Sequence, residues 1–188
     1  AAWTPVQLGI GYERPDAGGN DPEPTLEDVT RPGDVIQPTS FNSPGNEGVE
    51  LAIDNSTSTK YLNFDKLHAG FTVTPGVGPT VVVGLRVTSA NDAPERDPVS
   101  FTLEGTNDGV VFTEIARSRL PDFPARFHTV EVRFENPQSY RSYRLLFPEV
   151  RNAASAVAMQ LSEVELLGTA GPPPARFAEF IATDIEGW

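Results

Sequence analysis

The sequence contains no cysteine, and this absence excludes several kinds of chemistry. No disulfide, zinc–thiolate site or thiol nucleophile can form within its 188 residues. Histidine is scarce, with two residues, and no serine lies in a nucleophile-elbow setting. No apolar run is long enough to cross a bilayer, so we expect no membrane span.

Positive charge is also in short supply. Fourteen Lys and Arg stand against 26 Asp and Glu, which gives a formal net charge of −12. Because phosphate contacts need a basic surface, nucleic acid is not an expected partner. Residues 1–55 hold ten acidic residues and two arginines, whereas residues 117–151 hold seven arginines and four acidic residues. This asymmetry indicates either an ordinary mixed surface, or an acidic arm on a basic face or an anion-binding face.

Glycine and proline are plentiful, at 16 and 18 residues, and favour many short elements joined by turns. Short apolar runs recur between turn signals at 35–37, 49–53, 71–73, 81–88, 99–104, 110–116, 128–134, 142–147 and 159–167. Several alternate with a period of two, which is typical of half-buried strands; in one, Val81, Val83, Leu85 and Val87 share a face. Asp108-Gly109 predicts a hairpin. The pattern predicts an all-β antiparallel sandwich.

The composition also suggests boundaries. We expect an N-terminal arm with an acidic loop over 1–27, a β-domain over 28–168, a proline-rich linker over 169–174 and a C-terminal segment over 175–188. The segments 1–12 and 175–188 look like strands of a second, host β-domain that would lie side by side, with the β-domain inserted into a host loop. The chain begins Ala1-Ala2-Trp3 without an initiator Met, which we interpret as a piece of a longer protein.

One stretch, residues 51–61, concentrates oxygen-bearing side chains. Asp54, Ser56 and Thr59 lie within six positions, and hard cations such as calcium prefer carboxylate, hydroxyl and carbonyl oxygens. The alternative is a plain turn, in which Asp54 caps backbone N–H groups. In 161–166 the apolar alternation breaks between Leu161 and Val164, which predicts a bulge that re-aims Glu163.

Catalysis has little support in the sequence. Two carboxylate pairs, Glu95 with Asp97 and Glu163 with Glu165, have the residue types that a glycosidase needs. One pair, however, lies in an expected strand and the other lies beside an arginine. His128 shares a face with Val130 and Val132 and is expected to be structural. We therefore expect no catalytic residues and no enzymatic activity.

Four motifs follow one another along the chain: 52–61 (AIDNSTSTKY), 101–109 (FTLEGTNDG), 142–145 (SYRL) and 161–168 (LSEVELLG). In this order they resemble the discoidin family, also called the coagulation factor V/VIII type C domain family, and its galactose-binding-like relatives among carbohydrate-binding modules. The resemblance implies a jelly-roll β-sandwich of about eight antiparallel strands with its ligand loops at one end.

The resemblance also implies a calcium ion between the first long loop and the last strand. Its ligands would be Leu51, Asp54, Ser56, Thr59, Ser162 and Glu163, with side-chain oxygens from Asp54, Thr59 and Glu163 and carbonyls from the others. Two departures stand out. Asn55 replaces the usual glycine, which is acceptable because Asn also enters left-handed geometry, and Tyr61 lies at or near the place of a frequent tryptophan.

By loop position, the resemblance places the ligand surface at Asn63, Phe64, Asp65, Lys66, His68, Asn91, Asp92, Glu95, Arg96, Arg151 and Asn152. These loops hold both a ring and planar polar groups, which sugar recognition needs. Alternatives are an Arg96–Asp97 ion pair and a core position for Phe64. The implied function is that of a non-catalytic, calcium-stabilised carbohydrate-binding module of a secreted or cell-surface bacterial protein, with a glycan or polysaccharide as partner. The alternative is a structural or cell-adhesion module that contacts other domains or copies of its parent protein.

Overall fold

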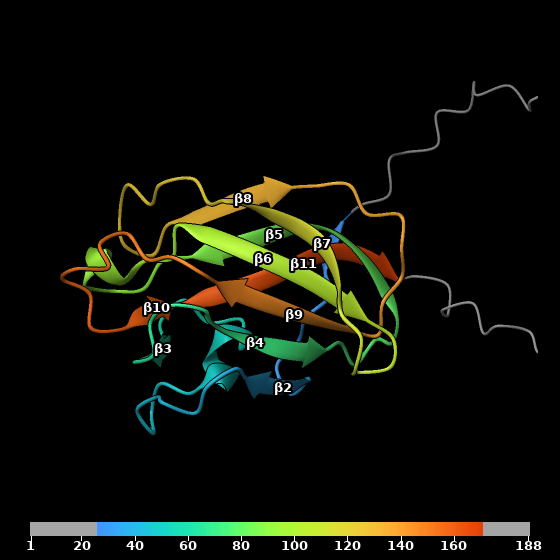
Figure 1. Cartoon of the computed structure of the whole chain (residues 1–188), viewed down its shortest axis with the longest axis horizontal. Coiled ribbons are helices and arrows are strands. Elements are labelled where there is room, and N and C mark those ends of the chain that lie inside the picture. Colours follow the sequence, from blue (N-terminus) through green and yellow to red (C-terminus); the bar gives the residue numbers. More distant parts are fainter. Residues whose placement is uncertain (1–25, 171–188) are drawn as a thin grey trace, which may run out of the picture.

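Two antiparallel sheets packed face to face make up most of the computed structural model, which describes residues 26–170 (Figure 1). One sheet has the order β1-β11-β5-β8, formed by Glu27–Asp28, Glu163–Ala170, Thr80–Thr88 and Thr129–Arg133. The other has the order β2-β4-β9-β6-β7, formed by Val35–Pro38, Ala69–Thr74, Ser142–Phe147, Ser100–Thr106 and Thr113–Arg119. A two-stranded ribbon pairs β3 with β10, Tyr61–Asn63 with Met159–Leu161. Two short 3-10 helices, η1 and η2, span Val49–Ala52 and Pro94–Arg96.

The expected antiparallel sandwich of about eight strands is therefore confirmed. The strands beyond eight are β1, β3 and β10, which have two or three residues each. The predicted hairpin joins β6 to β7, and Gly109 has a φ of 75°, the left-handed geometry that an Asp-Gly turn accepts.

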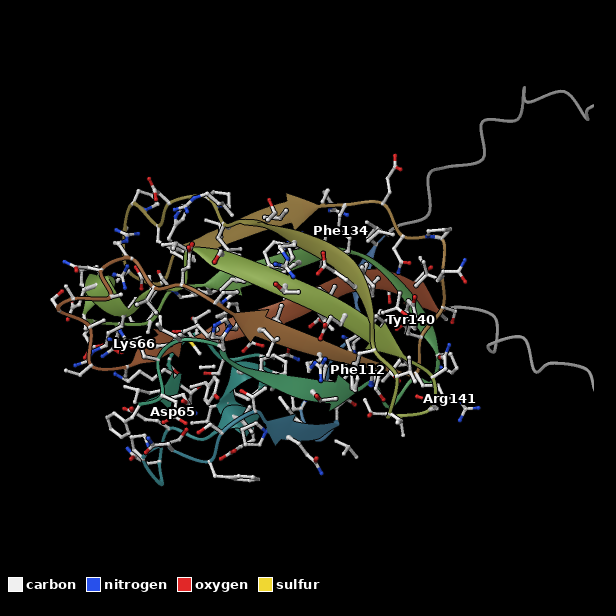
Figure 2. The ribbon with its side chains drawn as sticks, viewed as in Figure 1. Asp65, Lys66, Phe112, Phe134, Tyr140 and Arg141 are labelled. Atoms are coloured by element: carbon white, nitrogen blue, oxygen red, sulfur yellow. The ribbon has the colours of Figure 1, made fainter. Side chains whose placement is uncertain are left out.

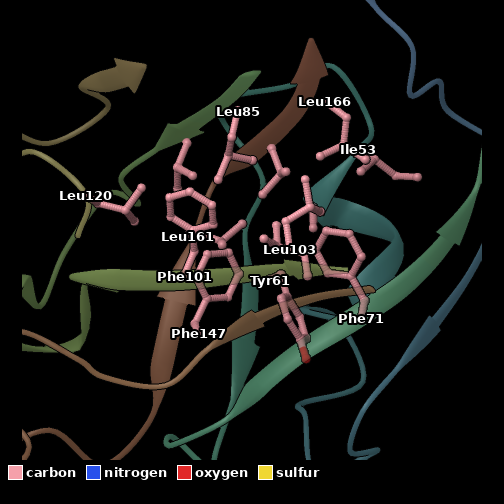
Figure 3. Close-up of a cluster of buried hydrophobic side chains, with 14 of the residues drawn as sticks. Ile53, Tyr61, Phe71, Leu85, Phe101, Leu103, Leu120, Phe147, Leu161 and Leu166 are labelled. Atoms are coloured by element: carbon pink, nitrogen blue, oxygen red, sulfur yellow. The ribbon is translucent and has the colours of Figure 1, made fainter. Parts of the chain in front are cut away.

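One apolar core fills the space between the sheets. Inward-facing residues alternate along β4, β9 and β6, and Phe71, Tyr143, Phe147, Phe101 and Leu103 have no exposed surface. Figure 3 shows several of these side chains meeting Leu85 and Leu166 from the other sheet. Burying each large side chain contributes about 1.5–3 kcal/mol, so this cluster supplies most of the driving force for folding.

The first half of β5 contradicts the predicted alternation. Val82, Leu85 and Val87 are fully buried, whereas Val81 and Val83 are partly exposed. In the pairing with β11, Leu167 lies opposite Gly84 and the next residue lies opposite Val82, so Val83 has no partner and forms a bulge. One extra residue exchanges the two faces of a strand, and this is why the prediction was wrong for Val81 and Val83.

Three other expectations need correction. The apolar run 49–53 forms the 3-10 helix η1 instead of a strand, and the run 110–116 enters β7 only at Thr113. His128 precedes β8 and is exposed, so it does not share the buried face of Val130.

The described part of the chain starts and ends at one place, because Glu27 pairs with Gly168 through β1 and β11. Such adjacency is what insertion into a host loop requires. The segments 1–12 and 175–188, on which the host-domain hypothesis rests, lie outside the described residues. No helix among residues 26–170 is long and apolar enough to span a membrane.

Candidate metal site and ligand loops

The chain changes sheets between β10 and β11, and Ser162 is the residue at the crossing. Leu161 ends the ribbon opposite Tyr61, while Glu163 begins β11 opposite Thr88. The Ser162 N–H donates to the Thr88 carbonyl at 2.8 Å. The break in alternation is therefore a strand crossing and not the predicted bulge. It turns Glu163 inward, where only 4% of its surface is exposed.

The loop 54–59 meets Glu163 there. Asn55 has a φ of 60°, the left-handed geometry expected for the residue in place of glycine. The Asp54 carboxylate accepts the Ser56 N–H at 2.9 Å and the Thr59 hydroxyl at 2.8 Å. The same Ser56 N–H also donates to Glu163 Oε2 at 3.1 Å. The two carboxylates thus share one donor, although they are far apart in sequence.

This pair of carboxylates is electrostatically costly without a counter-charge. Burial raises the pKa of Glu163 to about 8, and the nearby charges of Asp54 and Asp28 add to the effect, while the Ser56 N–H opposes it. Glu163 Oε1 and Ser162 Oγ are both buried and have no hydrogen-bond partner among residues 26–170. A buried polar atom without a partner costs about 1–3 kcal/mol, so this spot favours an additional positive group.

The residues present fit a calcium ion. Hydrogen bonds join four of the six expected ligands, Asp54, Ser56, Thr59 and Glu163, and Ser162 directly precedes Glu163 at the strand crossing. The sixth, Leu51, lies in η1, whose last residue is two positions before Asp54. Among residues 26–170 no group of three or more His, Cys, Asp or Glu side chains forms a metal cluster. An ion here would therefore depend on hydroxyl and carbonyl oxygens beside two carboxylates, a mixture that suits calcium.

The capping hydrogen bonds expected for a plain turn are also present. Thr59 Oγ1 bonds both the Asp54 carboxylate and, at 3.0 Å, the Ser56 carbonyl.

Asp28 is a nearby group that the sequence analysis missed. It reaches the site because β1 pairs with β11, and burial raises the pKa of its carboxyl group. A strand of two residues leaves no periodic pattern by which it could have been found.

Loops 64–68, 89–99 and 148–158 gather at one end of the sandwich, beyond β3 and β10 (Figure 1), and η2 lies within the second of these loops. Lys66 Nζ donates to the carbonyls of Ala153 and Ala156 at 2.7 and 3.2 Å. The Asn152 N–H donates to the Glu95 carbonyl at 3.0 Å. Figure 2 shows Asp65 and Lys66 at this end and Phe112 and Arg141 at the opposite end of the molecule. The three predicted ligand loops therefore form one connected surface.

A buried ion-pair cluster holds these loops in place. Asp97 is fully buried; both its oxygens accept hydrogen bonds from Arg126, and Arg151 approaches within 3.4 Å. Arg126 also donates to the Asp92 carbonyl at 3.1 Å. The considered Arg96–Asp97 pair is wrong, since Arg96 instead reaches Gln160 at 3.5 Å. Because Asp97 is committed to two arginines, it is not a free partner for Glu95 in acid–base chemistry.

Several predicted ligand residues are occupied in holding the loops. Asn63 is fully buried, donates to the Ser40 carbonyl and accepts the Asp65 N–H, both at 2.9 Å, so its place on the ligand surface was wrong. The Asp92 carboxylate accepts from Lys60 and Gln160 at 3.1 and 3.0 Å. The ammonium of Lys66 is engaged with loop 148–158, as described above. These side chains hold the loops in position, and their hydrogen-bonding groups are largely used within the protein instead of being free for a ligand.

Other predicted residues are accessible. Phe64 is 47% exposed and not in the core, and His68 is exposed with a φ of 60°. The side chains of His68, Asn91 and Glu95 make no hydrogen bond to any other residue within 26–170. Beside them a hollow of about 360 Å³ is lined by Leu67, Arg119, Glu149, Arg151 and Ala153. Phe41, which sequence analysis missed, is 86% exposed on the neighbouring loop, where the Asn42 carbonyl accepts the Phe64 N–H.

Comparisons with known proteins show which structures share this architecture. No family model matches the chain. Over 87 residues it is 32% identical to a peptide-N(4)-(N-acetyl-beta-glucosaminyl)asparagine amidase of Arabidopsis thaliana, a match that covers 45% of this chain and 12% of that protein's length. A CBM32 module from a family 31 glycoside hydrolase of Clostridium perfringens superposes with a TM-score of 0.63 at 14% identity, covering 78% of this chain and 96% of that one. The family 32 module of C. perfringens NanJ, in complex with galactose, gives 0.60 at 15%, covering 76% and 98%.

These superpositions establish the fold. The chain has the discoidin-like, galactose-binding-like β-sandwich of family 32 carbohydrate-binding modules, as the four sequence motifs implied.

Proposed function

We propose that this domain is a non-catalytic carbohydrate-binding module whose connected loops contact a glycan. The observation that carries the proposal is the exposure of an aromatic ring, Phe64, on a surface whose loops are fixed by Lys66 and by the Asp97 cluster. A ring suits the apolar face of a sugar, and fixed polar groups suit its hydroxyls. A surface that is held in place before binding loses little conformational entropy on binding.

The side chains that remain available define the expected contacts. His68, Asn91 and Glu95 offer unused donors and acceptors, and Asn152 is exposed on the loop bonded to Glu95. Arg151 extends this surface to the hollow beside Leu67. The galactose complex of a module with the same fold supports a sugar as the ligand class.

Calcium is proposed as a stabilising ion, held by Asp54, Ser56, Thr59, Ser162 and Glu163 with Leu51 nearby. When bound, it supplies positive charge beside two carboxylates. The chain's own contribution is to bring loop 54–59 against the start of β11 and to exclude water around Glu163. We also propose that the domain belongs to a secreted or cell-surface bacterial protein, which the origin of the similar modules in the bacterium Clostridium perfringens supports.

A glycan array probed with the purified domain tests the proposal, with calcium and with chelator. We expect binding to a defined set of glycans, and loss of this binding in His68→Ala and Asn152→Ala. Gln138→Ala, at an exposed position two residues before Tyr140, which Figure 2 shows towards the opposite end, serves as a matched control. Absence of glycan binding by the folded, calcium-saturated domain, together with self-association in solution, would instead favour the structural or adhesive role.

A further inference from the structure

The outer face of the five-stranded sheet carries two cross-strand rows of residues, most of them polar. Strand register places Gln37 beside Thr72, Thr72 beside Arg144 and Arg144 beside Glu104. The adjacent row contains Val35, Thr74, Ser142 and Thr106. Thr72, Thr74 and Ser142 have short side chains and line a depression on this face.

A loop forms one wall of this depression. The Asp108 carboxylate accepts the N–H groups of Val110 and Val111 at 2.8 and 2.9 Å and the Thr106 hydroxyl at 3.0 Å, which fixes the loop. Phe112 follows it, and the Arg144 guanidinium lies 3.9 Å from the centre of the phenyl ring. On the opposite side Val35 is 66% exposed. The groove has a volume of about 390 Å³, within the roughly 300–1,000 Å³ typical of ligand pockets.

The chemistry of the groove matches a neutral polyhydroxylated ligand. Its cation, Arg144, is paired with Glu104 through Nε, so the floor has no excess charge and the terminal guanidinium nitrogens remain as donors. Thr72, Thr74 and Ser142 add hydroxyls, and Gln37 adds an amide. Phe112 and Val35 supply apolar edges for the C–H faces of sugar rings. A peptide would find no deep apolar pocket for its side chains here.

We infer that this sheet groove, lined by Gln37, Thr72, Thr74, Phe112, Ser142 and Arg144, is a second glycan-binding site, for a neutral oligosaccharide. It lies on a sheet face near the end opposite the ligand loops, since Phe112 and Lys66 mark opposite ends in Figure 2. It does not depend on the loop surface for any lining residue. Two sites on one domain would increase avidity for a polysaccharide that reaches both.

Amide chemical-shift mapping with neutral tetrasaccharides of galactan, xylan and cellulose tests this inference. We expect at least one of them to shift the amides of Thr72, Ser142 and Gly109. Thr72→Arg places a long side chain in the groove at a solvent-facing position of β4, and should weaken this binding by about tenfold or more. Ser118→Arg adds the same charge at an exposed position of β7 outside the groove, and should leave it unchanged.

The loop surface provides the internal comparison. Shifts at His68 and Asn152 without shifts in the groove would overturn the second site and leave the proposed function intact, whereas no shift at either place would overturn both. Chemical-shift changes in the groove that persist in Thr72→Arg would also overturn the inference. So would changes that follow the protein concentration and not the sugar concentration, because they would identify a second copy of the chain as the occupant of the groove.

Discussion

Glu163→Gln separates a calcium site from a capped turn, because it removes the charge of the side chain and keeps its shape. In the metal-free protein, burial raises the pKa of Glu163 from 4.5 to about 8. At a pH between these two pKa values, the folded state therefore holds a proton that the unfolded state has released. The stability of the folded state is greatest when the pH is below the lower pKa, and it is lost as the pH rises through the upper pKa.

The size of the effect follows from this displacement of the pKa. Ionising the buried carboxyl costs the folded state about 5 kcal/mol once the pH is above about 8. Glutamine is neutral and does not incur this cost. In chelator near pH 8, we therefore expect Glu163→Gln to be more stable than wild type, and we expect the two proteins to converge near pH 4.

Calcium should reverse this order. An ion that binds only the folded state stabilises it by about 2.7 kcal/mol at a hundredfold excess over Kd. Wild type receives this gain, whereas Glu163→Gln lacks a charged ligand and should lose most of it. Asp54→Asn should likewise lose calcium stabilisation, since its carboxylate shares the Ser56 N–H with Glu163.

Urea unfolding followed by circular dichroism, over this pH range and with either chelator or calcium, measures these differences. Glu165→Gln is the matched control two residues along the same strand. Glu165 is bound to Arg86 at 3.0 Å on the outer face, so its loss should cost about 1 kcal/mol or less under all conditions. Equal effects of Glu163→Gln with and without calcium would refute the metal site and leave a capped turn.

Three further substitutions have expected outcomes. Asp97→Asn should destabilise the domain by about 3–5 kcal/mol in urea unfolding, because two arginines lose their buried partner; Asp122→Asn, at an exposed position, is the control, and equal midpoints would contradict the cluster's role. Gly70→Ala should largely abolish folding, judged by soluble yield and thermal melting, because its Cβ would lie 2.0 Å from the Leu145 carbonyl oxygen, whereas Gly45→Ala meets nothing within 4 Å and should behave as wild type. Asn55→Ala should cost about 1–2 kcal/mol, since alanine is disfavoured at positive φ, while Asn55→Gly should cost little; similar losses in both would point to the Asn side chain.

The sequence was sufficient to predict the fold because the alternation of apolar and polar residues along a strand is a local signal. Along β4, β6 and β9 each inward residue is apolar, so the pattern predicts the buried face directly. It failed at Val81 and Val83 because the bulge in β5 depends on the pairing with β11. It also failed at residues 49–53, where an apolar run packs into the core as a single 3-10 turn.

The candidate sites were predictable to different extents. The clustered oxygens of residues 54–59 are contiguous in the chain, and the motif around Glu163 indicated their distant partner. By contrast, the partners of Asp97 come from two other loops, and nothing local distinguishes Arg126 from Arg96. The exposure of Phe64 and the burial of Asn63 depend on how β3 pairs with β10, which single-residue preferences do not reveal.

The ribbon of β3 and β10 connects the candidate calcium site to the ligand loops. Its register pairs Tyr61 with Leu161 at one end, next to loop 54–59 and Ser162, and pairs Asn63 with Met159 at the other end, next to Phe64 and loop 148–158. Both strands are fully buried, so neither can shift without disturbing the core. A cation that holds loop 54–59 against Glu163 would therefore fix the start of β3 and the end of β10 together. It would thereby restrict the ligand loops at the far end of the same strands without contacting a glycan.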